Sequence, residues 1–250
     1  MKNLIYIFTL YCLVFFSCSK NNNVLPNSQG TSLNVINGII GAAPLFVKNN
    51  NAGLIFSKIA SGNKITYGAY LLSSPLAGQQ SYQFIQNTDT LHTLVNLNLN
   101  LATGGTYSLF LAGTVSQPDT LLTRDNLPYY PAADSVGGVR FINLSVGAAP
   151  VSVDIKGNAN GSEVASLPYK GATIFKTYSA THTVSSYIFE LRDAGTGTLI
   201  ASYTFSGVNN ATGTNTATNT FRFKNHTLAL IGQPGGTGAA AQKIILVNNY

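Results

Sequence analysis

The residue types that most often bind metals or transfer protons are few and far apart in this chain. The three histidines lie in threonine-rich segments, and none has a cysteine or acidic residue placed as a second ligand. A zinc or iron site needs three or four ligands at defined spacings, which do not occur. A calcium site built from backbone carbonyls and one or two carboxylates leaves no such signature and stays open. We predict no metal or other cofactor, and histidines that are exposed or on edge strands: His92, His182 and His226.

The acidic residues are also scattered. Glu190 and Asp193 flank Arg192 beside a predicted turn, which favours a surface ion pair over a pair of catalytic carboxylates. The two carboxylates of a glycosidase usually come from separate strands, so a pair such as Asp154 and Glu190 stays open. A hydrolase is therefore the least favoured of the functions considered below.

Motifs for nucleophilic catalysis and phosphate binding are incomplete. The sequence S-G-N-K at Ser61–Lys64 matches S-x-x-K without its companions S-D-N or K-T-G, and is read as a turn before a strand at Ile65–Leu72. The glycine cluster at Gly232–Gly238 lacks a P-loop lysine and precedes a strand, whereas phosphate cradling needs a helix N-terminus. We predict that the protein is not an enzyme.

The composition is poor in charge and rich in strand- and turn-forming residues. Only 9% of residues are charged, with 14 basic against 8 acidic residues and a net charge of +6, whereas an ordinary soluble domain has about 25%. The basic residues occur singly, which excludes a nucleic-acid footprint, and so few charges exclude a disordered tail or a coiled coil. The 45% hydrophobic content, with 13 Tyr and 13 Phe, is enough for one or two β-rich cores.

The first residues are typical of an export signal. Lys2 precedes a short apolar run at Leu4–Phe16, which is too short to span a bilayer, since about 20 apolar residues are needed. The run ends at Ser17-Cys18, which resembles the lipobox of bacterial lipoproteins. That resemblance implies that Cys18 becomes a lipidated N-terminus. The alternative is a plain cleaved signal followed by an incidental cysteine.

The cysteine count fits a lipid anchor. The other cysteine, Cys12, lies inside the signal, so a chain that starts at Cys18 can form no internal disulfide. The polar residues that follow, to position 30, are read as a tether, and two or more acyl chains on Cys18 would hold the protein stably. We expect an outer-membrane lipoprotein, periplasmic or surface-facing, whose membrane contact is this anchor.

A weaker pattern concerns surface modification. Asp89, Asp119 and Asp134 are each followed by a hydroxyl residue and an aliphatic one, as D-T-L or D-S-V. These triplets resemble the acceptor motif of protein O-glycosylation in exported proteins of Bacteroidetes-like bacteria. The resemblance implies solubilising glycans, on loops and between domains, at three acceptors: Thr90, Thr120 and Ser135.

The strongest internal signal is a duplication. Asn34–Val47 (N-V-I-N-G-I-I-G-A-A-P-L-F-V) and Arg140–Val153 (R-F-I-N-L-S-V-G-A-A-P-V-S-V) align without a gap, at a domain-length spacing of 106 residues. The later parts keep the same order, with Y-Q-F at Tyr82 matching Y-I-F at Tyr187. We predict this domain order: signal 1–17, lipidated N-terminus and tether 18–30, first repeat 31–127, Pro/Gly-rich linker 128–138, second repeat 139–250.

Each repeat is predicted to be all-β. Period-two alternation or doubly apolar runs mark the strands, and no stretch has sustained helical periodicity. Seven or so short strands per repeat predict two tandem immunoglobulin-like β-sandwiches, with Pro44 and Pro150 at strand starts. R-D-A-G-T-G-T predicts a hairpin between Phe189–Asp193 and Leu199–Phe205. Further expected strands are Tyr107–Ala112, Val151–Lys156, Ala201–Ser206, Thr220–Lys224 and Leu228–Ile231.

One stretch resembles a known family. Val139–Ile155 (V-R-F-I-N-L-S-V-G-A-A-P-V-S-V-D-I) is similar to the opening V-R-x-x-N-x-S-x-x-A-P-x-V-D-V of bacterial domain of unknown function 4397. Tyr107–Gly113 fits the family's later Y-T/S-x-x-x-x-G strand, and Thr227–Gly232 fits it without the aromatic residue. The resemblance covers most of residues 31–250. It implies a secreted or lipid-anchored β-sandwich and carries no catalytic residue.

Two functions from different classes follow. The first is a non-catalytic envelope module that binds a glycan or protein partner, with Tyr129, Tyr130 and the Asn/Thr-rich loop Val208–Asn219 as the exposed candidates. For both features the more ordinary interpretation is structural: a hinge pair packed between domains, and a hairpin tip. The second function is a structural accessory subunit of an outer-membrane assembly.

Overall fold

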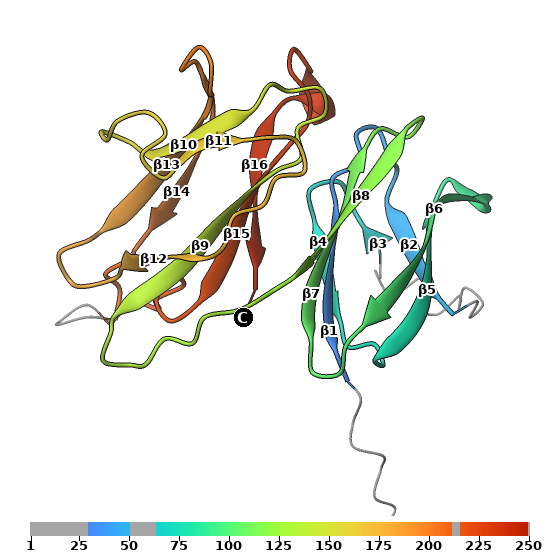
Figure 1. Ribbon diagram of the computed structural model, residues 1–250, viewed down its shortest axis with the longest axis horizontal. Helices are drawn as coiled ribbons and strands as arrows, with labels where there is room; N and C mark the ends of the chain where they lie inside the picture. The colour runs from blue at the N-terminus through green and yellow to red at the C-terminus, as the bar shows by residue number, and fades with distance from the viewer. Residues whose placement is uncertain (1–29, 51–63, 212–215, 250) are drawn as a thin grey trace, which may run out of the picture.

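The computed structural model describes residues 30–50, 64–211 and 216–249 (Figure 1). Over these residues the chain is all-β: it forms sixteen strands and one short 3-10 turn, Gly238–Ala240, but no α-helix. The strands build two immunoglobulin-like β-sandwiches, as the alternation and turn spacing predicted.

The first sandwich consists of two four-stranded sheets with the orders β4-β1-β7-β8 and β3-β2-β5-β6. Strands β1 and β7 run parallel, and the other neighbours run antiparallel. The strand bounds are β1 Ser32–Asn37, β2 Leu45–Asn49, β3 Lys64–Ile65, β4 Tyr70–Ser73, β5 Gly78–Gln86, β6 Asp89–Leu101, β7 Thr106–Gly113 and β8 Pro118–Arg124.

The second sandwich repeats this topology strand for strand. Its sheets have the orders β12-β9-β15-β16 and β11-β10-β13-β14, and β9 and β15 form the parallel pair. The aligned sequence motifs therefore occupy equivalent strands, with Ile36 in β1 and Ile142 in β9. The bounds are β9 Val136–Asn143, β10 Val151–Ile155, β11 Val164–Leu167, β12 Lys176–Ser179, β13 Ser186–Asp193, β14 Leu199–Ser206, β15 Asn225–Ile231 and β16 Lys243–Asn248.

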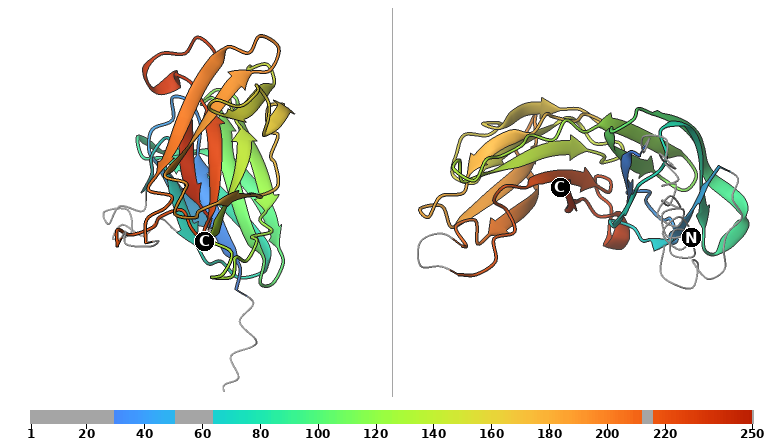
Figure 2. Two further views of the ribbon diagram at one scale, coloured as in Figure 1. Left: turned by 90° about the vertical axis from the view of Figure 1, so that its left-hand side faces the viewer. Right: turned by 90° about the horizontal axis from the view of Figure 1, so that it is seen from below.

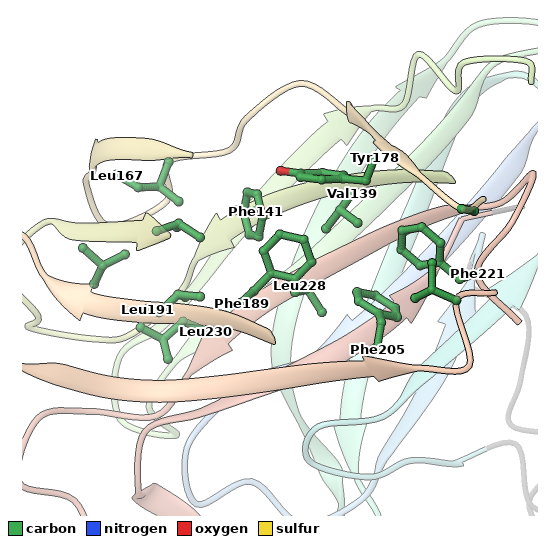
Figure 3. Close-up of a cluster of buried hydrophobic side chains, with 14 residues drawn as sticks. Val139, Phe141, Leu167, Tyr178, Phe189, Leu191, Phe205, Phe221, Leu228 and Leu230 are labelled. Carbon is green, nitrogen blue, oxygen red and sulfur yellow. The ribbon is translucent and has the colours of Figure 1, made fainter. Parts of the chain in front are cut away.

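Each sandwich has its own core between its two sheets. The second core is aromatic, and Phe189 lies at its centre (Figure 3). The ring centroid of Phe189 is 5.3 Å from that of Phe141 and 5.1 Å from that of Tyr178, both edge-to-face. The first core is mainly aliphatic, with Phe84 fully buried in it. Alternation at period two along the strands directs these side chains inward.

A third apolar cluster joins the two sandwiches. The outward face of the β4-β1-β7-β8 sheet contributes Ile36 and Phe110, and that of the β12-β9-β15-β16 sheet contributes Ile142, Ile231 and further residues. The sheets therefore stack in layers that curve into an arc (Figure 2). Strands β7 and β15 are apolar on both sides because one side faces a core and the other faces this interface.

A buried polar network lies at the edge of the same interface. Arg140 on β9 is 3% exposed and donates to Asp125 Oδ1 of the first sandwich at 2.7 Å and to Thr227 Oγ1 at 2.7 Å. Its second terminal nitrogen lies 3.2 Å from Ser108 Oγ on β7. Asn249, near the C-terminus, donates to both Ser108 and Asp125. One cation from the second sandwich thus binds a carboxylate of the first, away from water.

The predicted hairpin is confirmed, since β13 and β14 pair antiparallel, and both prolines immediately precede strands β2 and β10. The prediction of a strand at Thr220–Lys224 is wrong, because Asn219 Oδ1 accepts from the backbone amides of Phe221 and Arg222 and holds them in a turn. Phe223 there has a φ of 62°.

The predicted strand Ile65–Leu72 is wrong as one element. It divides into the end of β3 and most of β4, which belong to different sheets, with a turn at Gly68 (φ 80°) between them. Likewise, β9 begins at Val136, inside the segment predicted as linker. Gly138 is a strand residue, and glycine fits there because a Cβ would lie 2.1 Å from the Tyr130 hydroxyl.

Candidate binding grooves in the second sandwich

A groove of about 340 Å³ opens on one side of the second sandwich, where β14 of one sheet faces β16 of the other. Tyr203 is half-buried on its wall and packs edge-to-face on Phe205, with ring centroids 4.9 Å apart. The remaining lining is mostly polar and contains no carboxylate. The groove is lined by Tyr203, Thr204, Phe205, Ser206, Thr220, Lys224, His226, Leu246 and Asn248.

The imidazole of His226 is the most unusual group in this groove. The residue is 2% exposed and stacks on Phe221 with ring centroids 5.7 Å apart. Its Nδ1 lies 2.9 Å from Asn248 Oδ1, while Asn248 Nδ2 donates to the Tyr70 hydroxyl at 3.2 Å. With the amide oriented in this way, Nδ1 carries the proton, and Nε2 is buried away from solvent.

The buried histidine gives a pH prediction. Burial lowers the pKa of His226 from its ordinary value of 6.5, so between the two pKa values the unfolded chain binds a proton that the folded chain does not. The free energy of unfolding should therefore fall as the pH drops below about 6.5, by at most about 1.4 kcal/mol per pH unit. Urea unfolding at pH 7.5 and 5.5 should show a larger loss for wild type than for His226→Gln. If both proteins lost the same free energy of unfolding between these pH values, His226 would not be the group responsible.

A second groove, of about 380 Å³, lies on the opposite open side, between β11 and β12. Its walls are largely apolar and include Phe141, Val164 and Ile174, which is 87% exposed. The ion pair between Lys176 and Glu163, at 2.6 Å, borders it. Such a surface can bury apolar groups of a partner but offers few positions for sugar hydroxyls.

The two carboxylates that could have formed a catalytic pair are brought together and share one guanidinium. Asp154 on β10 lies opposite Glu190 on β13, and they are 2% and 7% exposed. Both pair with Arg192: its Nε lies 3.3 Å from Asp154 Oδ1, and its Nη2 contacts Glu190 Oε2. Burial raises the pKa of Asp154, an effect that Arg192 opposes and Glu190 reinforces. Sequence spacing found the Glu190–Arg192 pair but missed Asp154 as its third member.

The sequence predicted a surface ion pair of Arg192 with the flanking Glu190 and Asp193. That prediction is wrong, because Glu190 is buried. Asp193, which was grouped with it, instead accepts hydrogen bonds from the amides of Gly195 and Thr196 and stabilises the hairpin turn. Those bonds lower the pKa of Asp193.

The histidines share no common environment. His92 is exposed on β6 and pairs with Asp89 at 2.8 Å, an acidic neighbour that the spacing argument overlooked. His182 is exposed in a turn. His226 is buried, which contradicts the expectation of an exposed or edge-strand residue. Among the described residues, no group of three or more potential ligands is placed to hold a metal ion.

The linker tyrosines differ from each other. Tyr129 is 88% exposed, as a binding residue would be. Tyr130 is 9% exposed, and its hydroxyl donates to Asn225 Oδ1 at 3.0 Å, so it packs against the second sandwich and is not a free surface residue. The loop 208–219 is described except for residues 212–215, and Asn219 binds back to it through the carbonyls of Val208 and Asn210.

The predicted acceptor residues lie in three different settings. Thr90 is exposed at the start of β6, and Thr120 is half-buried within β8, so neither lies in a loop. Ser135 is half-buried immediately before β9 with a φ of 46°. Glycosylation of the three stays a prediction. Cys18 lies outside the described residues, and no helix within them is long and apolar enough to cross a membrane.

Comparisons with known proteins found no matching family model and no matching curated protein. Among solved structures, the family 41 carbohydrate-binding modules of streptococcal virulence factors that recognise α-glucan align over 86% of this chain and 96% of theirs, at 13% identity and a TM-score of 0.25. An α-glucan-binding streptococcal virulence factor aligns over 80% and 93%, at 11% identity and a TM-score of 0.25. The multi-modular glycogen-degrading pneumococcal virulence factor SpuA aligns over 79% of this chain and 20% of its own, at 12% identity and a TM-score of 0.26. These TM-scores are too low to bear on the function of this chain.

Proposed function

We propose that the protein is a non-catalytic module of the cell envelope that binds a glycan in the groove between β14 and β16. The observation that carries this proposal is the combination of a half-buried aromatic ring with convergent hydroxyl and amide groups in one groove of about 340 Å³. Sugars present both apolar C–H faces and hydroxyl groups, so a site for them needs both kinds of surface.

Individual groups have defined tasks in this proposal. Tyr203 is held by Phe205 and offers its ring to a sugar face. The imidazole of His226 is buried behind the groove wall, where its Nδ1, 2.9 Å from Asn248 Oδ1, holds the side-chain amide of Asn248 in the lining. Thr204 and Ser206, exposed on β14, supply hydroxyls that can donate or accept.

Support for a non-catalytic role comes from the buried carboxylates. Asp154 and Glu190 are both committed to Arg192 and lie away from the groove lining. A general acid or base must reach the substrate, and neither Asp154 nor Glu190 can reach a ligand bound in the β14–β16 groove. Retention at the outer membrane through lipids on Cys18, and kinship with domain of unknown function 4397, remain parts of the proposal that rest on sequence alone.

The binding proposal is tested by titrating envelope polysaccharides and other neutral and charged glycans into the purified protein by calorimetry. Tyr203→Ala should weaken binding about tenfold or more, equal to about 1.4 kcal/mol, because among the described lining residues it removes the only aromatic ring that is partly exposed. Tyr129→Ala, an equally large truncation in the linker, is the matched control and should bind as wild type does.

Two results would contradict the proposal. Absence of binding to every glycan tested would remove its basis. Weaker binding by Tyr129→Ala, together with unchanged binding by Tyr203→Ala, would move the site to the linker.

The apolar groove between β11 and β12 favours a second function, that of an accessory subunit of a membrane-bound assembly. Ile174 is 87% exposed and continues the apolar lining of this groove, so together they form a surface that a protein partner could cover. This function predicts that the protein co-purifies with a larger complex after mild detergent extraction and that Ile174→Asp releases it. A monomer after such extraction would count against it.

A further inference from the structure

The edge strands of the four sheets differ in how they are protected from pairing with another chain. An exposed edge presents unpaired backbone amides and carbonyls, and short length, charge or proline normally blocks it. Strands β3, β4, β11 and β12 have at most four residues. Strand β8 carries Pro118, Asp119 and Arg124, strand β16 carries Lys243, and the edge of β14 lines the groove described above.

Most of strand β6 lacks these protections, although Asp89 and two register shifts lie near its start. It has 13 residues, against about 5–6 in an average strand. From Thr93 to Leu101 it contains no charged residue, proline or glycine. It lies at the edge of the β3-β2-β5-β6 sheet, and no described strand pairs with its outer side. Its register against β5 is continuous from Val95 to Leu101, so this stretch is regular and free of bulges.

The two faces of this stretch are chemically uniform. Asn96, Asn98 and Asn100 are exposed on the outer face of the sheet. The residues between them, with Val95 and Leu101 at the ends, face the core of the first sandwich. A strand added antiparallel with the correct register would therefore meet amides on one face and aliphatic side chains on the other.

We propose that β6 pairs antiparallel with β6 of a second copy of this chain, with Asn98 at the two-fold axis. Asn98 is the central residue of the regular stretch, so this register uses all of it. Each Asn96 then lies opposite Asn100 of the other copy, and side-chain amides, which both donate and accept, can bond across the axis. Aliphatic residues meet aliphatic residues on the other face, and the paired stretch contains no charged residue. The two four-stranded sheets become one continuous sheet of eight strands.

The sharpest test is a disulfide at the axis. Opposed residues of antiparallel strands have Cα atoms about 4.5–5.5 Å apart, within the range of about 4.4–6.8 Å that a disulfide spans. The full-length Asn98→Cys protein in mild detergent should form a covalent dimer on mild oxidation. The native cysteines, Cys12 and Cys18, are present in the wild-type control. Gln79→Cys is the matched variant: Gln79 is exposed and pairs with Asn100 from β5, one strand in from the edge. It should not cross-link.

A charge variant tests the same contact without a new bond. Sedimentation velocity should show that wild type is a dimer that dissociates on dilution, whereas Asn98→Lys is a monomer because two lysines would face each other at the axis. Mixing Asn98→Lys with Asn98→Asp should restore dimers. A wild-type monomer at all concentrations, a dimeric Asn98→Lys protein, or equal cross-linking of Asn98→Cys and Gln79→Cys would each overturn the proposal. The contact lies in the first sandwich, so glycan binding by the second is tested separately.

Discussion

Replacing Arg140 with methionine is expected to lower the free energy of unfolding by about 3–5 kcal/mol. The guanidinium is 3% exposed and is bonded to Asp125, Thr227 and Ser108. Without it, the carboxylate of Asp125 stays buried at the interface with only Ser108, Thr123 and Asn249 as hydrogen-bond donors. A buried charge that loses its partner is far more costly than the loss of an exposed pair.

The chain offers a matched control for this change. Asp119 and Lys170 also link the two sandwiches, at 2.8 Å, but both side chains are more than a third exposed. Asp119→Asn should therefore cost no more than about 1 kcal/mol. Urea unfolding followed by tyrosine fluorescence measures both. If Arg140→Met and Asp119→Asn were equally mild, the buried network would not hold the sandwiches together.

Replacing Phe189 with alanine is expected to cost about 3–5 kcal/mol, because the residue is fully buried at the centre of the aromatic core. Its ring contacts those of Phe141, Tyr178, Tyr187 and Phe205, which come from both sheets of the second sandwich. The cavity that remains cannot close without moving both sheets.

The measurement is again urea unfolding, with Tyr129→Ala as an exposed aromatic truncation that should change stability by less than about 0.5 kcal/mol. The first sandwich has a separate core, so its own stability should be little affected by Phe189→Ala. A loss below about 1 kcal/mol for Phe189→Ala would show that the core repacks around the missing ring.

Much of the fold could be predicted from local pattern. Alternation and doubly apolar runs located strands β7, β10, β13, β14 and β15, and the aligned repeats implied that both halves share one topology, which the sheet orders bear out. The predictions failed where side chains overrode propensity. Thr220–Lys224 alternates as a strand does, but the Asn219 side chain captures its amides. The glycines before Val139 indicated a boundary, but Gly138 is there because Tyr130 approaches the backbone of β9.

The interface and the grooves were harder to predict because they depend on contacts distant in sequence. Nothing local to Arg140 reveals that its carboxylate partner belongs to the other repeat. The one available signal was that Tyr107–Ala112 and Leu228–Ile231 are apolar on both faces, which marked them as strands without showing that the second face meets the other sandwich. The groove draws on β14, β16 and the segment at Thr220–His226, so its lining becomes visible only once the strand order is known.

The most direct test of glycan binding in the β14–β16 groove is an NMR titration of the isotope-labelled protein with the tightest-binding glycan. Binding there predicts that backbone amide shifts change most at Tyr203–Ser206, around His226 and at Asn248, and that Tyr203→Ala abolishes these changes at the same glycan concentration. Changes confined to the first sandwich or to the linker around Tyr129, or no changes at all, would contradict the proposed site.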